Sequence, residues 1–224
     1  MRTHFPCKFC GAKFVSESRY LRHRCKEMIR DEEIRSPIGQ AAWSFYQEWM
    51  KNQKRLVPSI QSFMKSNFYV SFIKFAAFVK KYAIPDSKLY IKVMIENGVD
   101  PTIWTNDEIY SIYIQYLDRQ ASATQQANIT MKTLYNLSKA AECDISEIFD
   151  HLTHSEVIAL LKQRRLSPWI LIFSKKFNNF VQSASTEQNA IYFALIKQRF
   201  WQERFAKYPD DVKKMKEHVK MLGI

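Results

Sequence analysis

Three cysteines and one histidine with the spacing of metal ligands lie within the first 25 residues of this 224-residue chain. Cys7 and Cys10 are separated by two residues, His23 follows after twelve more, and Cys25 comes two positions later. Thiolate and imidazole are ligands that suit Zn²⁺, and two cysteines at this spacing form a knuckle that presents both sulfurs to one ion. Gly11 follows the knuckle, where the backbone turns with positive φ. The pattern predicts one structural zinc ion held by these four side chains.

The fourth ligand is the uncertain part of this pattern, because His23 and Cys25 are only two positions apart. Residues two apart on an α-helix differ by about 200° in direction, so they cannot both reach one ion from a regular helix. We therefore expect the helix to end or tighten near His23, and Cys25 to complete a Cys3His site. His4 is the alternative fourth ligand, and a segment that binds no metal is the remaining alternative.

The segment around these ligands resembles the C2H2 family of zinc fingers. In that family an aromatic residue lies four positions after the second cysteine and a large apolar residue lies three before the first histidine. Phe14 and Tyr20 occupy those places, and Ser16 is a good N-cap for the helix between them. The resemblance implies a small ββα finger over residues 1–26, with a miniature core of the two rings and the metal.

The same resemblance implies how the finger would meet DNA. The base-reading positions of the family fall on Ser16, Arg19 and Arg22, and arginine suits a bidentate contact with guanine. Lys8, Lys13 and Arg24 would then face phosphates. One finger reads only about three base pairs, so the rest of the chain would have to add affinity. The alternatives are that these cations form a solvated face, or that the finger binds a protein.

The remaining chemistry-bearing residues do not indicate an enzyme. A zinc ion with four protein ligands leaves no open position for a substrate, and the sequence shows no convergent carboxylates. His151 and His154 lie beside Asp150 and Glu156, but Thr153 begins a helix between them, so we expect a capping turn. Cys143 is expected to be a small buried apolar residue and not a nucleophile. We expect no catalytic residue and no small-molecule substrate.

The positive charge of the chain is unevenly distributed. The net charge is +12, with basic segments at 1–26 (+6), 51–92 (+8) and 161–224 (+8) and acidic ones at 27–50 (−3) and 93–160 (−7). Basic blocks of this kind attract polyanions through phosphate neutralisation and counterion release. The acidic block 93–160 either contacts a basic partner or balances charge within the fold. Together with the finger, this distribution predicts contact with nucleic acid.

Composition and helix signals predict an all-α class. The chain has 4 Gly and 7 Pro against 16 Phe, 11 Tyr and 5 Trp, which is poor in the tight turns that short strands need. About nine helices are expected after residue 36, and their start signals are Ser36-Pro37, Pro58-Ser59, Ser66, Asp86, Thr105-Asn-Asp-Glu108, Thr153-His-Ser-Glu156, Ser167-Pro168, Ser185 and Pro209. We expect a finger at 1–26, a linker or short solvated helix at 27–36, and one compact helical body at 37–224.

Lysine-rich helices between residues 51 and 92 are the second candidate surface for nucleic acid. Their cations are Lys51, Lys54, Arg55, Lys74, Lys80 and Lys81, with Lys65 among them. Phe68, Tyr69 and Tyr82 are interleaved with these residues and would stack on unpaired bases if they were exposed. The alternative is an ordinary solvated side of amphipathic helices. Lys162, Arg164 and Arg165 close another helix, where the helix dipole already favours cations.

The helical part resembles, over residues 60–205, the helicase-loading proteins of T4-like phages. The resemblance is carried by Phe75-Ala-Ala-Phe78-Val-Lys-Lys-Tyr82 and by the stretch from Tyr135-Asn-Leu-Ser138-Lys139 to Trp169. Those proteins are small, basic and helical, bind forked or single-stranded DNA, and recruit a helicase. A zinc finger followed by a helical body also resembles products of large tailed phages.

Two functions follow as expectations. The first is a zinc-finger accessory protein of phage-like DNA replication, recombination or transcription, with DNA and replication proteins as partners. The second is a phage structural or assembly protein whose finger and basic surface contact other virion proteins. No apolar run approaches the roughly 18 to 20 residues that span a bilayer. We expect no membrane partner and a location in the cytoplasm, that of the host cell for a phage protein, or in the virion.

Overall fold

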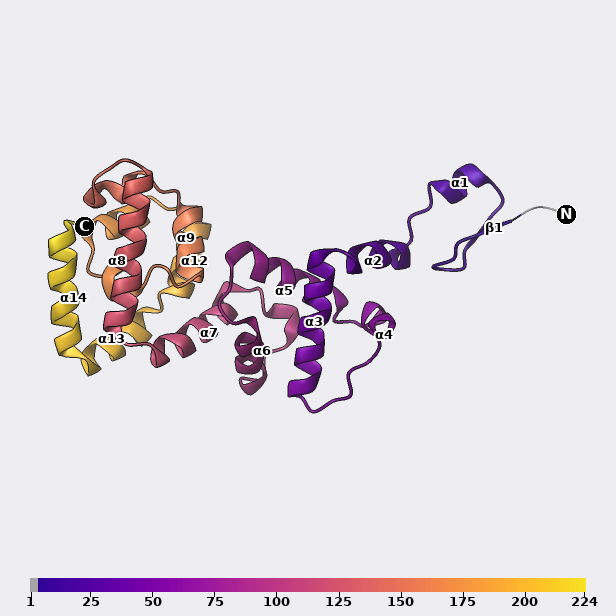
Figure 1. The fold of residues 1–224 in the computed structure, drawn as a ribbon, viewed down its shortest axis with the longest axis horizontal. Coiled ribbons are helices and arrows are strands. Elements are labelled where there is room, and N and C mark those ends of the chain that lie inside the picture. The colour runs from indigo at the N-terminus through magenta and orange to yellow at the C-terminus, as the bar shows by residue number, and fades with distance from the viewer. Residues whose placement is uncertain (1–3) are drawn as a thin grey trace. The chain divides into compact units, whose positions relative to one another are not determined.

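The computed structural model describes residues 4–224, which form helices preceded by one small pair of antiparallel strands (Figure 1). Strands β1 (Phe5–Pro6) and β2 (Lys13–Phe14) pair with Phe5 opposite Phe14. Fourteen α-helices and two 3-10 helices follow within the described residues. The expected all-α class with a small strand-containing finger is confirmed.

The helical part divides into two compact units, whereas the sequence suggested one body over 37–224. The first unit holds the chain through Lys81 together with residues 87–103, and the second holds residues 82–86 and 104–224. The helices of the first unit are α1 (Glu17–Leu21), α2 (Lys26–Ile34), α3 (Pro37–Asn52), α4 (Ile60–Lys65), α5 (Tyr69–Tyr82), α6 (Ser87–Glu96) and η1 (Pro101–Ile103). Those of the second are α7 (Asp107–Gln120), α8 (Ala123–Ala140), η2 (Ile145–Asp150), α9 (His154–Lys162), α10 (Pro168–Leu171), α11 (Lys175–Gln182), α12 (Thr186–Leu195), α13 (Gln198–Lys207) and α14 (Pro209–Leu222).

Aromatic side chains form the core of the first unit. The ring of Tyr46 on α3 lies 4.6 Å from that of Phe63 on α4 and 5.3 Å from that of Phe72 on α5, measured between centroids. Phe63 and Phe72 are fully buried. Edge and tilted ring contacts of this kind add to the free energy gained by burial alone. The aromatic stripe expected along residues 68–79 is therefore mainly core.

Residues 27–36, expected as a linker or a short solvated helix, form a helix that is docked on its neighbours. Ile34 at the end of α2 is buried, and the Tyr69 hydroxyl on α5 donates a 2.8 Å hydrogen bond to Glu33 Oε2. The Arg30 guanidinium lies 4.6 Å from the centre of the Tyr69 ring. These contacts come from α5, far along the chain, and they bind α2 to the rest of the unit. Of the two alternatives, the segment is the short helix, and its contacts dock it on the unit.

Gly39 permits the close approach of α2 to α3. A Cβ atom at this position would lie 2.2 Å from the Glu33 carbonyl oxygen and 2.5 Å from the Ile34 Cα atom. Both contacts are with backbone, which cannot rotate away as a side chain would. We expect Gly39→Ala to lower the free energy of unfolding of this unit by about 1–3 kcal/mol through overpacking. Denaturant titration measures the loss, with Ser44→Ala on the exposed side of α3 as the control. An unchanged midpoint would contradict the packing.

Side-chain caps begin five of the nine expected helices at the expected residues, whereas Ser66, expected to open a helix, is the C-cap residue of α4. Ser36 accepts a hydrogen bond from Gly39 N, and Thr153 and Glu156 form the expected capping box. At α7 the cap is Asn106, which accepts from Glu108 N, and not Thr105. Asparagine caps a helix as well as threonine does, so the start shifts by one residue. Among the described residues, twelve α-helices follow residue 36, against about nine predicted. The three for which no start was expected are α8, α11 and α13.

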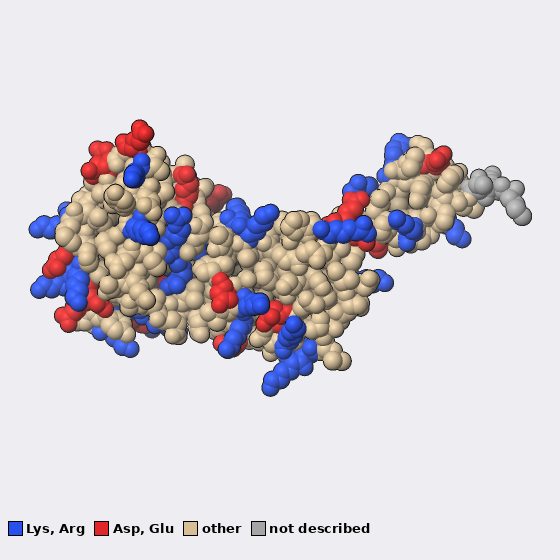
Figure 2. Space-filling model, viewed as in Figure 1, with Lys and Arg blue, Asp and Glu red and all other residues tan. Residues whose placement is uncertain are grey.

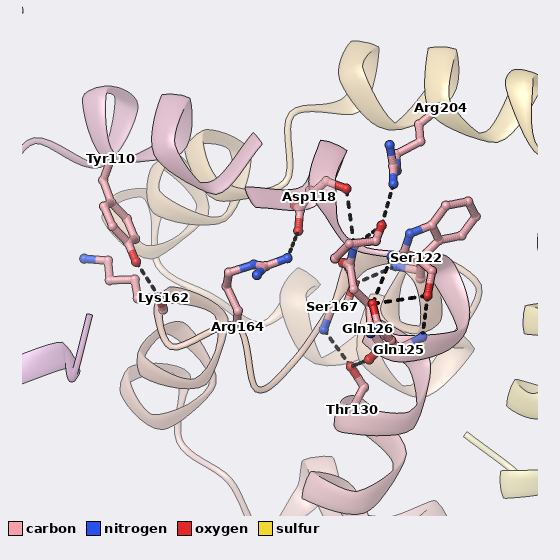
Figure 3. Close-up of polar contacts among 12 residues, drawn as sticks. Tyr110, Asp118, Ser122, Gln125, Gln126, Thr130, Lys162, Arg164, Ser167 and Arg204 are labelled. Carbon is pink, nitrogen blue, oxygen red and sulfur yellow. Dashed lines mark hydrogen bonds and ion pairs between the residues drawn. The ribbon is translucent and has the colours of Figure 1, made fainter. Parts of the chain in front are cut away.

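A buried polar network joins α7, α8 and the segment after α9 in the second unit (Figure 3). Asp118 is paired with Arg164 at 2.9 Å, and their side chains are 4% and 23% exposed. Ser167 Oγ donates to Gln126 Oε1 at 2.7 Å, and the Ser167 amide donates to Thr130 Oγ1 at 2.9 Å. Burial raises the pKa of Asp118, and the opposing effect of Arg164 is smaller. The network fixes the chain that follows α9 against α8.

Lys162 and Arg164, considered from the sequence as phosphate candidates, are internal residues. Lys162 Nζ lies 2.6 Å from Asp107 Oδ1 and 4.0 Å from the centre of the Tyr82 ring, and the lysine side chain is 3% exposed. Arg164 has a positive φ of 56° at the end of α9, which turns its side chain to Asp118. Neither cation is available to a polyanion. The reason is pairing with acids distant in sequence, which the local pattern does not reveal.

No helix within residues 4–224 combines the length and the apolar character needed to span a membrane.

Candidate metal centre

The four predicted ligands lie together at the N-terminal end of the chain. The ligand atoms of Cys7, Cys10, His23 and Cys25 are all within 4.8 Å of one another. The Sγ atoms of Cys7 and Cys25 are 3.9 Å apart, and Cys10 Sγ is 3.3 Å from His23 Nε2. Metal–ligand bonds of about 2.3 Å to sulfur and about 2.0 Å to nitrogen give tetrahedral edges of about 3.5–3.8 Å. The arrangement is close enough to bind one metal ion, and His4 is not part of it.

The knuckle between β1 and β2 positions the first two cysteines. Cys7 N donates to Ala12 O at 2.8 Å, and Gly11 N donates to Cys7 O at 2.9 Å. Gly11 has φ of 73°, as the turn requires. Backbone amides of Cys10 and Phe9 donate to the Cys7 sulfur, which lowers the pKa of Cys7 to about 6. This thiolate is therefore available to a metal at neutral pH.

The end of helix α1 resolves the conflict between His23 and Cys25. Helix α1 ends at Leu21, and the His23 amide donates to Tyr20 O at 3.1 Å in a tight turn. The expectation that the helix ends near His23 is confirmed. Cys25 then lies in extended backbone, with φ of −89° and ψ of 162°, at the N-cap position of α2. Two residues that a regular helix would direct apart thus reach one site.

Aromatic rings support the site as the C2H2 resemblance implied. The Phe14 ring lies 4.6 Å from the His23 imidazole and 6.2 Å from the Tyr20 ring. Phe5 on β1 stacks on Tyr20 at 6.1 Å. Of these rings, Phe5 is the one not singled out in the sequence, although it lies two positions before the first cysteine. Ser16 lies at the N-cap position of α1 but makes no side-chain capping hydrogen bond.

The predicted DNA-contacting residues of the finger lie at its surface. Arg19 on α1 and Arg22 just after it are exposed, and Ser16 is half-buried. Arg22 Nε donates to Ser18 O at 3.3 Å, so this side chain folds back on the helix end. Arg24 forms a 2.7 Å ion pair with Glu32 of α2 and is only in part available to phosphate. Lys8 and Lys13 are exposed.

The cations of the second predicted surface are exposed, whereas its aromatic rings are buried or half-buried. Lys51, Lys54, Arg55, Lys74, Lys80 and Lys81 are all exposed. Tyr69 is 1% exposed, and the Phe68 ring packs 4.8 Å from Trp49. Tyr82 lies under Lys162. Tyr69 is therefore closed to bases, and Phe68 and Tyr82 are half-buried with a side chain packed against each ring.

His151 is the C-cap residue of η2 and His154 is the first residue of α9, so both lie in the expected capping turn. His154 Nδ1 is 3.1 Å from the Tyr192 hydroxyl, and its Nε2 is 3.3 Å from Ser183 Oγ. Both ring nitrogens of His154 therefore contact uncharged hydroxyl groups. Among the described residues, only the finger gathers three or more potential metal ligands of the kind Cys, His, Asp or Glu.

Comparison with protein-family models, with curated proteins and with solved structures finds no match to this chain, so the geometry above is the basis for any functional conclusion.

Proposed function

We propose that this chain is a zinc-finger accessory protein that binds DNA. The observation that carries the proposal is the cluster of Cys7, Cys10, His23 and Cys25, around a fold in which exposed arginines flank the ligands. Three sulfurs and one imidazole favour Zn²⁺ over the hard cations Mg²⁺ and Ca²⁺. The ion would order the finger and take no part in a reaction, because the four side chains complete its coordination. No catalytic role is proposed for it.

Charge on both finger and helices supports a polyanionic partner. Figure 2 shows Lys and Arg side chains over the finger and near the C-terminal end of α3. Neutralisation of six or more phosphates makes affinity fall by about a thousandfold between 50 and 200 mM salt. We expect this steep dependence for forked, single-stranded or duplex DNA, measured by fluorescence anisotropy. Absence of binding to all three at low salt would reject the proposal.

The finger arginines provide a residue-level prediction. Exchange of Arg19 and Arg22 for alanine is expected to weaken duplex binding by about 1–3 kcal/mol per base-contacting arginine. Both side chains are exposed, so the fold should be unchanged. Arg199→Ala is the matched control, because Arg199 is 92% exposed but lies on α13 in an ion pair with Glu203. Equal affinities of the double variant and the wild type for duplex DNA would show that the finger is not part of the DNA interface.

A second candidate function is a contact between the finger and another protein, as in an assembly or virion protein. Two apolar side chains of the finger favour it, because Val15 is 58% exposed and Leu21 is 72% exposed. Contiguous exposed apolar side chains mark sites of contact with other proteins, and these two would contribute to such a patch. Co-purification with capsid or tail proteins that is lost in Leu21→Ser and persists after nuclease treatment would favour this function over DNA binding.

A further inference from the structure

The turn between α3 and α4 begins with a hydrogen-bonded cap at the end of a long helix. Helix α3 ends at Asn52, and the amides that follow fold back on its last turn: Lys54 N donates to Lys51 O at 2.9 Å, and Arg55 N donates to Met50 O at 3.0 Å. This pair of bonds is the Schellman motif, in which the residue after the helix cap adopts a left-handed conformation. The turn therefore presents its side chains from a fixed backbone.

The residues of this turn break two local rules. Lys54 has φ of 57°, a conformation in which glycine is favoured and a side chain is strained. Leu56 is 93% exposed, the largest value among the exposed large apolar side chains described. Departures from local preference without a compensating contact are expected at functional positions. We call residues 51–56 the α3–α4 tip.

Three exposed cations lie within five positions of the exposed leucine in the sequence. Lys51, Lys54 and Arg55 are exposed, and no ion pair engages any of them in the part of the chain that the structure describes. The nearest acid in sequence, Glu48, accepts a 2.9 Å hydrogen bond from Asn52 Nδ2. Blue side chains stand out at this end of the helix in Figure 2. The tip thus combines one apolar side chain with an unneutralised positive patch.

We propose that the α3–α4 tip is a wedge for an open base step of DNA, such as the end or the junction of a duplex. Leu56 inserts beside the last stacked base pair, and Lys51, Lys54 and Arg55 contact the flanking phosphates. DNA-bending proteins use apolar wedges flanked by cations in this way. An open step is favoured because its bases are already unstacked, so binding does not have to supply the free energy of unstacking. The inference rests on the proposed DNA-binding function and names a site for it outside the finger.

Charge and apolar area both favour DNA over a lipid surface as the occupant. A protein segment that lies on a membrane buries a continuous apolar face of a helix. The tip offers a single leucine in a turn, which is enough to cover one base but provides little area for insertion into acyl chains. Three cations within five residues of each other are complementary to the phosphates on either side of one base step.

Two variants of the full chain test the wedge. Leu56→Ala should weaken binding to a forked DNA by about tenfold at fixed salt, leave the salt dependence unchanged, and reduce the fluorescence increase of a 2-aminopurine placed at the junction. Lys54→Gly should raise the melting temperature, because glycine relieves the left-handed strain, while it weakens DNA binding and lowers the salt slope by about 0.9. Opposite effects on stability and affinity cannot arise from a purely structural role. Phe193→Ala, at a 72% exposed aromatic residue of α12, is the control and should change neither.

The outcomes separate this inference from the proposed function. If the wild type binds none of the DNA forms, the proposed function fails. If the wild type binds DNA and both tip variants bind forks as tightly as it does, the wedge is overturned and DNA binding stands. Binding to vesicles of anionic lipid that Leu56→Ala abolishes, with DNA affinity unchanged, would overturn the wedge in favour of a membrane contact.

Discussion

Cys7→Ser is expected to release the metal and to unfold the finger while leaving the two helical units folded. The finger has little to stabilise it without an ion: β1 and β2 have two residues each, and α1 has five. A helix of this length is unstable alone, and structural zinc supplies an apparent folding free energy of about 10–16 kcal/mol in finger peptides at pH 7. Loss of one thiolate removes most of that stabilisation.

Elemental analysis and thermal unfolding measure the two parts of this result. We expect the zinc content to fall from about one ion per chain to near zero, because structural zinc prefers four ligands and the variant retains three of them. The cooperative unfolding of the helical units should persist. Cys143→Ser is the matched control, because Cys143 is half-buried and lies outside the ligand cluster. Full zinc content in Cys7→Ser, or loss of zinc in Cys143→Ser, would contradict the assignment of the site.

Metal removal should also affect the start of α2, because Cys25 is both a ligand and the N-cap residue of that helix. Its side chain makes no capping hydrogen bond, so a bound metal would be what holds Cys25 at the helix start. Faster amide exchange after chelation is expected for Met28 and Ile29 at the start of the helix. The other end of α2 should stay protected, because Ile34 is buried and Glu33 accepts from Tyr69.

The finger could be predicted from sequence because its determinants are local. Cys7, Cys10, His23 and Cys25 span 19 positions, and the helical periodicity alone showed that the helix had to end before Cys25. The capping residues Ser36, Ser59, Thr153 and Ser185 were recognisable for the same reason, since each bonds an amide three positions later. A start signal was also present at Ser122 and Gln125, which form a capping box for α8. It was overlooked.

Other features have no local signal. Helix α13 begins without a side-chain cap, so its start cannot be seen in the sequence. Asp118 and Arg164 are 46 positions apart, and nothing near Arg164 distinguishes a cation that pairs internally from one that faces solvent. The same holds for Tyr69, which bonds Glu33 across 36 positions and thereby turns the expected linker into a docked helix. Contacts between residues distant in sequence, and not helix propensity, determine whether these side chains face the interior or the solvent.

Removal of either partner of the Asp118–Arg164 pair is expected to lower the free energy of unfolding strongly. The pH dependence of the loss should differ between the two variants. Asp118→Ala is expected to lower the free energy of unfolding by about 3 kcal/mol, the low end of the range for a broken buried pair, because Arg164 retains 23% exposure. A guanidinium cannot lose its proton in this pH range, so the variant has no titrating group at this position. Because burial raises the pKa of Asp118 in the wild type, wild-type stability falls as pH rises above about 4, and the loss in Asp118→Ala should be no larger at pH 8 than at pH 4.5. Circular dichroism with denaturant at both pH values measures it.

Arg164→Ala should instead give a loss that depends on pH. Burial already raises the pKa of Asp118, and removal of the arginine raises it further, so the folded state of the variant binds a proton that the unfolded chain has lost above about pH 4. Stability therefore falls as pH rises between these two pKa values, and protonation at low pH relieves the buried charge. We expect Arg164→Ala to be closer to wild type at pH 4.5 than at pH 8, while Asp118→Ala is not. The reverse order, or equal losses for both variants at both pH values, would show that the pair does not carry a buried charge, and would leave the Gln126–Ser167 hydrogen bond as the contact that fixes this part of the second unit.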